Sequence, residues 1–148
     1  MASLAFSLIL QTAVLASGAQ QQDYSQAFES TLKTGRPLVV FVGADWCSAC
    51  QEMKQSTLPK LRKTGILRKV AFAVVNTDRQ SRLAEKLMKG STIPQLIMYR
   101  KTSKGWKRTQ LTGFQNEKKV ESFIAQAIRL QKDEMIKAKT VSQSKVAE

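Results

Sequence analysis

Two stretches of the sequence are apolar without any alternation of polar side chains. The first is PLVVFVG, at residues 37–43, and the second is VAFAVV, at residues 70–75. A strand with one face in water alternates apolar and polar residues, whereas a strand covered on both faces does not. Each stretch therefore predicts a strand in the middle of a sheet that is covered on both sides.

Apolar residues recur at helical spacing before, between and after these strands. The first predicted helix is 23–33, capped by Asp23 and ended by Gly35, and the second is 47–57, with Pro59 starting or kinking a further turn. The third is 79–89. The last begins at about Asn116, and its apolar stripe extends towards Ile136. The two predicted strands are thus separated by a helix, as in a parallel pair with a crossover connection.

A β-hairpin is predicted before the last helix. PQLIMYR (94–100) and WKRTQLTGF (106–114) are rich in strand-forming residues, and KTSKG separates them. The sequence therefore predicts an α/β fold, with a central mixed sheet of about four strands, a parallel pair plus the antiparallel hairpin, and helices on both faces. We place this single domain at residues 20–137 and a flexible basic tail at 138–148.

Residues 1–19 are typical of a secretory signal peptide. They carry no charged side chain, include an apolar run from Leu4 to Leu15, and end in small residues that suit cleavage between Ala19 and Gln20. The run is about 12 residues long, and a membrane-spanning helix needs roughly 20. The sequence thus predicts an exported protein, periplasmic or secreted, with an uncleaved N-terminal tether as the alternative. Export would place the cysteines where disulfides persist.

The chain is strongly basic, with 24 Lys and Arg against 11 Asp and Glu and a formal net charge of +13. Basic residues cluster at 60–69 and 100–108. Such a charge attracts acidic proteins or anionic envelope surfaces. Trp106 and Tyr99 lie in the predicted hairpin, where packing explains aromatic residues. With an export signal and no recognised nucleic-acid-binding fold, nucleic acid is not an expected partner.

Both cysteines of the chain, Cys47 and Cys50, follow the first buried strand. A closed zinc site needs about four Cys or His ligands, and the chain has no histidine, although two thiolates can hold copper(I). A disulfide across so short a loop stabilises a fold little.

At the first turn of a helix, free backbone N–H groups favour the Cys47 thiolate, and Cys50 can then resolve a mixed disulfide. We favour redox chemistry, with copper handling and an inert pair as alternatives.

These features together resemble the thioredoxin superfamily. The resemblance rests on FVGADWCSAC at a strand-to-helix junction, STIPQL before the next strand, and the glycine of LTGF before the last helix. It implies that Cys47 is the nucleophile and Cys50 the resolving thiol of a redox-active disulfide. The positions that it assigns to the substrate groove are Trp46, Ile93, the cis-proline Pro94 and Gly113.

Three positions depart from thioredoxin itself. Ser48 and Ala49 stand between the cysteines in place of Gly-Pro, and Phe41 stands in place of a buried aspartate. Asp45 is expected to face solvent and not to replace that carboxylate. Together with the signal sequence, these departures resemble the exported thioredoxin-fold proteins of bacteria.

The sequence thus predicts an exported thiol–disulfide oxidoreductase. Ile93 before the proline resembles the reducing members of the superfamily, which favours a protein-disulfide reductase. Cysteine-containing proteins are the expected substrates, an upstream dithiol is the expected electron donor, and neither a metal nor another cofactor is expected. We expect a monomer. The alternative is a thioredoxin-fold binding module whose dithiol is incidental or carries copper(I).

Overall fold

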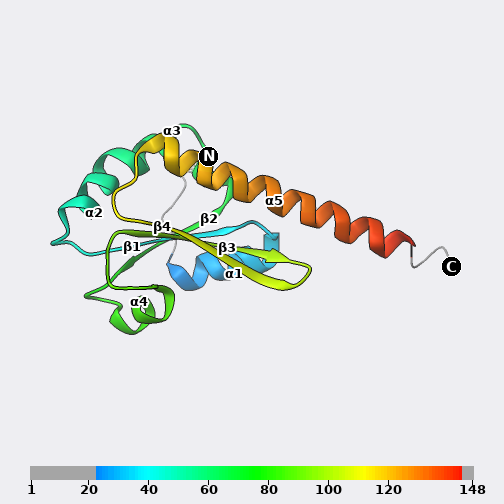
Figure 1. Cartoon of the computed structure of the whole chain (residues 1–148), viewed down its shortest axis with the longest axis horizontal. Helices are drawn as coiled ribbons and strands as arrows, with labels where there is room; N and C mark the ends of the chain where they lie inside the picture. Colours follow the sequence, from blue (N-terminus) through cyan, green and yellow to red (C-terminus); the bar gives the residue numbers. More distant parts are fainter. Residues whose placement is uncertain (1–22, 145–148) are drawn as a thin grey trace, which may run out of the picture.

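A four-stranded mixed sheet forms the centre of the computed structural model, which describes residues 23–144 (Figure 1). The strand order is β2-β1-β3-β4, with β1 parallel to β2 and antiparallel to β3, and with β3 antiparallel to β4. The strands are β1 (Leu38–Gly43), β2 (Ala71–Asn76), β3 (Gln95–Thr102) and β4 (Gly105–Thr112). The predicted signal peptide, with its cleavage site at Ala19 and Gln20, and residues 145–148 lie outside the described residues.

Helical segments cover both faces of this sheet. They are α1 (Tyr24–Thr34), α2 (Ser48–Glu52), the π-helical turn η1 (Met53–Thr57), α3 (Leu58–Lys63), the 3-10 turn η2 (Ile66–Lys69), α4 (Ser81–Leu87) and α5 (Glu117–Ser144). One buried cluster joins the sheet to α1 and α4, and the other joins it to α3 and α5. The predicted α/β fold, with a parallel pair, an antiparallel hairpin and flanking helices, is confirmed.

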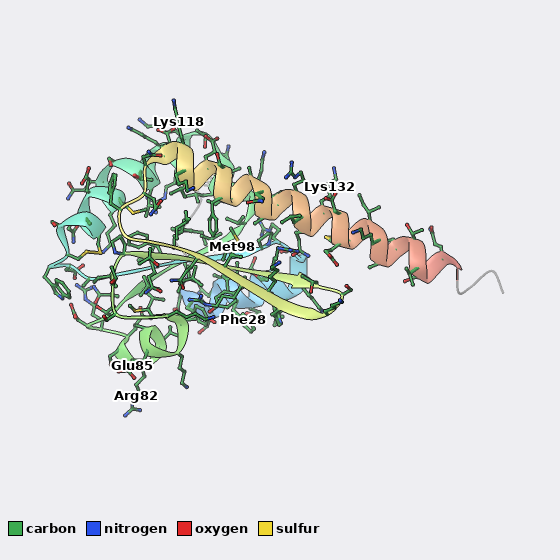
Figure 2. The ribbon with its side chains drawn as sticks, viewed as in Figure 1. Phe28, Arg82, Glu85, Met98, Lys118 and Lys132 are labelled. Carbon is green, nitrogen blue, oxygen red and sulfur yellow. A yellow bond between two sulfur atoms is a disulfide. The ribbon has the colours of Figure 1, made fainter. Side chains whose placement is uncertain are left out.

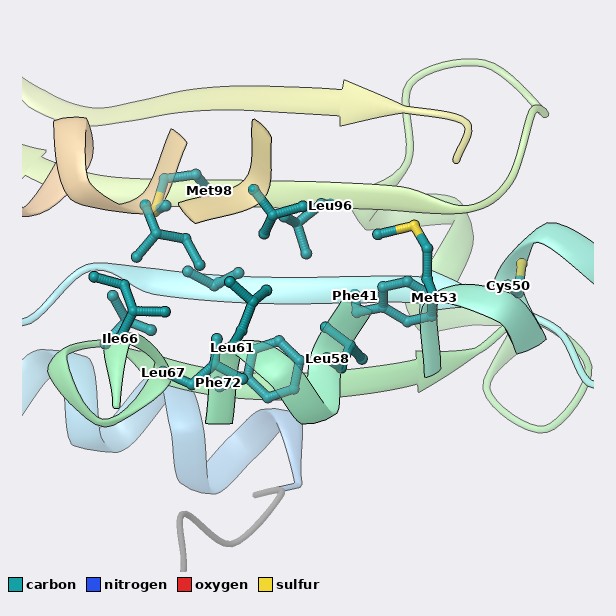
Figure 3. Close-up of a cluster of buried hydrophobic side chains, with 14 of the residues drawn as sticks. Phe41, Cys50, Met53, Leu58, Leu61, Ile66, Leu67, Phe72, Leu96 and Met98 are labelled. Carbon is teal, nitrogen blue, oxygen red and sulfur yellow. The ribbon is translucent and has the colours of Figure 1, made fainter. Parts of the chain in front are cut away.

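Strand β1 is the centre of the core, because all six of its residues are buried. Leu38, Val40 and Val42 belong to the cluster under α1 and α4, whereas Val39 and Phe41 belong to the cluster under α3 and α5. Burying a side chain of this size stabilises the fold by about 1.5–3 kcal/mol. Figure 3 shows the second cluster, in which Phe41 and Met53 lie at the end nearest Cys50. The covered strand that the apolar pattern predicts therefore leads directly into the cysteine pair.

The helix predicted from Cys47 to Thr57 is interrupted in the structure. It is α-helical only from Ser48 to Glu52 and then passes through the π-helical turn η1 into α3. At the end of η1 the N–H of Leu58 donates to the carbonyl of Met53, five residues earlier. Pro59 follows and has no N–H to donate to the preceding turn, so the regular α-helical hydrogen bonds cannot continue through it.

The last helix is longer than the sequence suggests. The sequence predicts a flexible tail from residue 138, whereas α5 continues as helix through Ser144. No Gly or Pro interrupts the segment from Glu117 to Ser144, and a helix satisfies its own backbone groups without a core contact at every turn. The part of the predicted tail that the structure describes is therefore helical as far as Ser144. Within residues 23–144, no helix is both long enough and apolar enough to cross a membrane.

Candidate active site

The two cysteines lie where β1 ends and α2 begins, and a disulfide joins them. Cys47 is the N-cap residue of α2, and its sulfur accepts a hydrogen bond from the backbone N–H of Cys50 at 3.2 Å. A backbone N–H aimed at a sulfur stabilises negative charge on it when the disulfide is opened. The local geometry thus suits a thiolate at Cys47.

The two cysteine residues differ in their exposure to solvent. Both belong to the buried cluster that contains Phe41 and Met53, but Cys47 keeps 8% of its surface exposed and Cys50 keeps none. Among residues 23–144, the buried polar side chains are those of Thr, Gln and Arg, and none is a carboxylate. Phe41, which stands where thioredoxin has a buried aspartate, therefore leaves Cys50 in apolar surroundings.

Gly43, the last residue of β1, makes room for Cys50, a role that the sequence reading missed. A Cβ atom placed on Gly43 would lie 2.9 Å from Cys50 Sγ and 3.1 Å from Phe41 Cε1. Real Cβ contacts essentially never fall below 3.0 Å. Gly43 is thus required by the close approach of the cysteine side chain to the strand. The signal for it was its position directly after an unbroken apolar run.

The loop before β3 brings Ile93 and Pro94 beside the disulfide. The peptide bond between these two residues is cis, and the carbonyl oxygen of Ile93 lies 4.0 Å from Cys47 Sγ. Pro94 is buried, and its carbonyl accepts a hydrogen bond from the N–H of Gly113 at 2.8 Å. Gly113, with φ of +80°, is in the left-handed region that favours glycine. The structure therefore brings Cys47, Ile93, Pro94 and Gly113 together.

A buried glutamine holds this loop in place, and the sequence reading did not single it out. Gln95 is fully buried, and its amide nitrogen donates to the carbonyl oxygens of Lys89 and Thr92, both at 3.0 Å. Its amide oxygen accepts from the N–H of Lys89 at 3.3 Å. A polar residue directly after a proline, at the start of an apolar strand, was the available signal.

An open groove of about 520 Å³ lies between Trp46, which precedes Cys47, and Ile93 and α4, and neither cysteine is among the residues that line it. Trp46 is 72% exposed, and its ring N–H donates to Asp78 at 3.3 Å, which orients the indole. Gly113 approaches from the β4 side and is not among the described residues that line the groove. Of the groove positions implied by the resemblance, Trp46 and Ile93 therefore share this surface, and Gly113 lies beyond Pro94.

The charged groups near the pair are on the surface. Asp45 forms ion pairs with Arg79 at 2.9 Å and Lys54 at 3.4 Å, and its side chain is 52% exposed, as expected. Exposed pairs of this kind contribute little to stability. In the described part of the chain, no group of three or more His, Cys, Asp or Glu side chains is placed to hold a metal ion.

The sequence was compared with known families and proteins. The family described as thioredoxin-like matches residues 19–101, which is more than half of the 148 residues. The chain belongs to this thioredoxin-like family. Comparison with curated proteins gives no match.

Solved structures of thioredoxins share the fold of this thioredoxin-like chain. A thioredoxin from Thermus thermophilus is 20% identical, with a TM-score of 0.62 over 74% of this chain and 86% of that one. A thioredoxin from Trichomonas vaginalis is 21% identical, with a TM-score of 0.56 over 72% and 93%. A structure described as DsbH oxidoreductase is 18% identical, with a TM-score of 0.59 over 86% and 96%. At these identities the likeness concerns the fold alone.

Family, fold and disulfide agree at a coarse level. A thioredoxin-like chain with a Cys-x-x-Cys disulfide at its first strand-to-helix junction has the parts that thiol–disulfide exchange requires. These observations support redox activity of the oxidoreductase type, with thiol-containing proteins as the general class of substrate.

Proposed function

We propose that this protein is an exported thiol–disulfide oxidoreductase that reduces disulfides of protein substrates through Cys47 and Cys50. The observation that carries the proposal is the asymmetry of the pair, because Cys47 keeps 8% of its surface exposed and Cys50 keeps none. Such a pair offers one sulfur to a substrate and keeps the second for the intramolecular step. Export rests on the sequence of residues 1–19.

The reaction starts from the reduced dithiol. The Cys47 thiolate attacks one sulfur of a substrate disulfide, which forms a mixed disulfide and releases the other substrate sulfur as a thiol after it takes up a proton. The sulfur of Cys50 then gives up its proton, attacks Cys47 Sγ and releases the second substrate thiol. Two electrons and two protons pass to the substrate, and the Cys47–Cys50 disulfide remains. An upstream dithiol restores the reduced form.

The surroundings of Cys47 support an extended peptide as the substrate. The Ile93 carbonyl beside Cys47 belongs to backbone at the edge of the groove, and Trp46 provides an exposed aromatic wall. Backbone and aromatic surface together bind a chain segment with little demand on its side chains. The proposal thus assigns substrate contact to Trp46 and Ile93, with Pro94 and Gly113 supporting the backbone that presents Ile93.

Reduction of insulin tests the activity. With dithiothreitol as the electron source, wild-type protein is expected to accelerate the appearance of turbidity, and Cys47→Ser is expected to abolish the acceleration. Cys50→Ser keeps the first step and is expected to accumulate mixed disulfides that mass spectrometry can identify. Thermal unfolding of each variant controls for loss of fold. Wild-type activity no higher than that of Cys47→Ser would refute the proposal.

Equilibration with glutathione tests the direction of electron flow. A potential near or below about −270 mV is expected for a reductase, and a value near −120 mV would reassign the protein as an oxidant. N-terminal sequencing tests export, since a mature chain beginning at Gln20 in the periplasmic or culture fraction is expected. A chain that retains Met1 and stays in the cytoplasm would refute export.

A further inference from the structure

The end of the molecule opposite the disulfide carries a patch of exposed apolar side chains. We call it the distal patch and define it as Leu32, Trp106, Met135, Ile136 and Val141. Each of these side chains is between 44% and 58% exposed. In Figure 1 the tip of the β3–β4 hairpin and the far half of α5 extend away from α2, where the disulfide lies. The patch is thus separate from the candidate active site.

The residues of the distal patch form one continuous surface. A cavity of about 810 Å³ between α1, the hairpin and α5 is lined by four of them, Leu32, Trp106, Met135 and Val141. A neighbouring groove of about 300 Å³ shares Met135 and adds Ile136. The three elements therefore contribute to a single apolar region with Met135 at its centre.

Contacts beneath the distal patch hold its elements together. The Trp106 ring packs against Phe28 of α1, with ring centroids 6.2 Å apart. The carboxylate of Glu134 on α5 accepts a hydrogen bond from the backbone N–H of Ser103, at the hairpin tip, at 3.2 Å. The hairpin is thereby joined to both α1 and α5, so the patch is presented on a preformed surface.

The charges around the distal patch are almost all positive. The residues that line its cavity and its groove include six basic side chains and one acidic side chain, and the acidic one is Glu134, which binds Ser103. The basic residues are Arg36, Lys69, Lys101, Lys132, Lys137 and Lys139. The chemistry of the surface is therefore an apolar centre with a cationic margin.

We propose that the distal patch docks on an anionic membrane surface. An exposed tryptophan and aliphatic side chains with surrounding lysines form the combination that enters the headgroup region of a bilayer, where lysine stems lie along apolar surface and their amines bind lipid phosphates. Protein interfaces, in contrast, are depleted in lysine. Docking by this end leaves the disulfide at the other end, turned away from the bilayer and open to substrates.

Tryptophan fluorescence tests the orientation, because Trp46 and Trp106 are the two tryptophans of the chain. In full-length Trp46→Phe, Trp106 is the reporter, and vesicles of phosphatidylcholine with phosphatidylglycerol are expected to shift its emission to the blue. Brominated lipid is expected to quench it. In Trp106→Phe, the remaining Trp46 is expected to show neither effect. Quenching of Trp46 without quenching of Trp106 would overturn the proposal.

Matched lysine pairs on α5 test the location of binding. Lys137 and Lys139 border the distal patch, whereas Lys118, labelled in Figure 2, and Lys119 are exposed at the other end of the same helix. Changing the first pair to Gln is expected to lower the vesicle partition coefficient by up to about 25-fold, since each basic residue near an anionic surface contributes about fivefold. Changing the second pair alters net charge equally and is expected to have a much smaller effect.

Three further outcomes would contradict docking of the distal patch on a membrane. All variants begin at the same residue, so any contribution of the residues before Asp23 is constant in the comparison. Equal losses from the two lysine pairs would assign binding to net charge and overturn the proposal. Binding to polyglutamate but not to phosphatidylglycerol vesicles would assign the distal patch to an acidic protein. Self-association detected by light scattering, with no vesicle binding, would assign it to a second copy of the chain.

Discussion

Gly43→Ala is the sharpest test of how the fold positions the buried cysteine. The added methyl carbon would lie 2.9 Å from Cys50 Sγ and 3.1 Å from both Cys50 Cβ and Phe41 Cε1. Ordinary van der Waals contacts lie between 3.4 and 4 Å, so all three neighbours have to move by several tenths of an ångström. The backbone of Gly43 is not in the left-handed region, so the variant tests space and not backbone strain.

Inserting one methyl group into a closely packed core costs typically 1–3 kcal/mol. For a protein of this size, each kcal/mol lowers the melting temperature by about 2–4 °C, so Gly43→Ala is expected to lower it by roughly 2–12 °C. The loss is expected to be larger in the oxidised protein, because the bond to Cys47 fixes Cys50 Sγ, whereas a free thiol can rotate away. If reduction of the disulfide relieves about 1.4 kcal/mol of the destabilisation that the added methyl group causes, the disulfide potential rises by about 30 mV.

Calorimetry with and without dithiothreitol measures the melting temperature of the reduced and the oxidised protein, and glutathione equilibration measures the disulfide potential. Gly90→Ala is the matched control, because Gly90 has φ of +75° and a Cβ there meets nothing within 4 Å. It is expected to cost about 1–2 kcal/mol through backbone strain and to leave the potential unchanged. A Gly43→Ala protein with wild-type melting temperature and potential would refute the packing argument.

Three further changes address other parts of the molecule. Phe41→Asp places a carboxylate beside Cys50 and is expected to speed decay of the mixed disulfide in stopped flow, relative to Phe41→Leu. Thr57→Val removes the hydrogen bond to the Gln115 carbonyl and is expected to cost about 1–2 kcal/mol in urea denaturation. Burial raises the pKa of Tyr24 above 10.0, so the unfolded chain loses this proton first and stability falls above about pH 10; Tyr24→Phe is expected to reduce that fall.

The sheet could be predicted because its strands are determined by short, local patterns. The unbroken apolar runs of β1 and β2 are buried on both faces only in the middle of a covered sheet. The hairpin could be predicted because a short turn sequence separates its two strands. The position of the cysteine pair follows in turn, because a residue directly after a central strand must lie at the edge of the sheet. What could be derived was therefore the framework of the site.

The supporting contacts could not be derived, because they join residues that are distant in the sequence. Gln95 alone reads as one polar residue in a strand, and its role depends on the carbonyl groups of Lys89 and Thr92, which the folded loop turns towards it. The contact between Gly43 and Cys50 requires the angle at which α2 leaves β1. The π-helical turn at Met53 and the distal patch are similarly results of packing, which a periodic pattern does not specify.

Helix α5 contributes to both ends of the molecule, and its two halves can be separated. Val120, Ile124 and Ala127 are buried against the sheet in the cluster that includes Cys50, whereas every described side chain from Met135 onward is exposed. Truncation after Lys137 removes Lys139 and Val141 but no core residue. It is expected to change stability by no more than about 0.5 kcal/mol, as for other surface changes.

This truncation is also expected to leave insulin reduction unchanged while it weakens binding to phosphatidylglycerol vesicles. Thermal unfolding, the turbidity assay and vesicle sedimentation measure the three quantities on one preparation. Loss of reductase activity in a truncated protein that remains folded would mean that residues 138–144 of α5 support the disulfide. Unchanged vesicle binding would mean that the residues of the distal patch that remain, Leu32, Trp106, Met135 and Ile136, are sufficient. The two ends of α5 have separate roles only if the truncated protein still reduces insulin and binds vesicles more weakly.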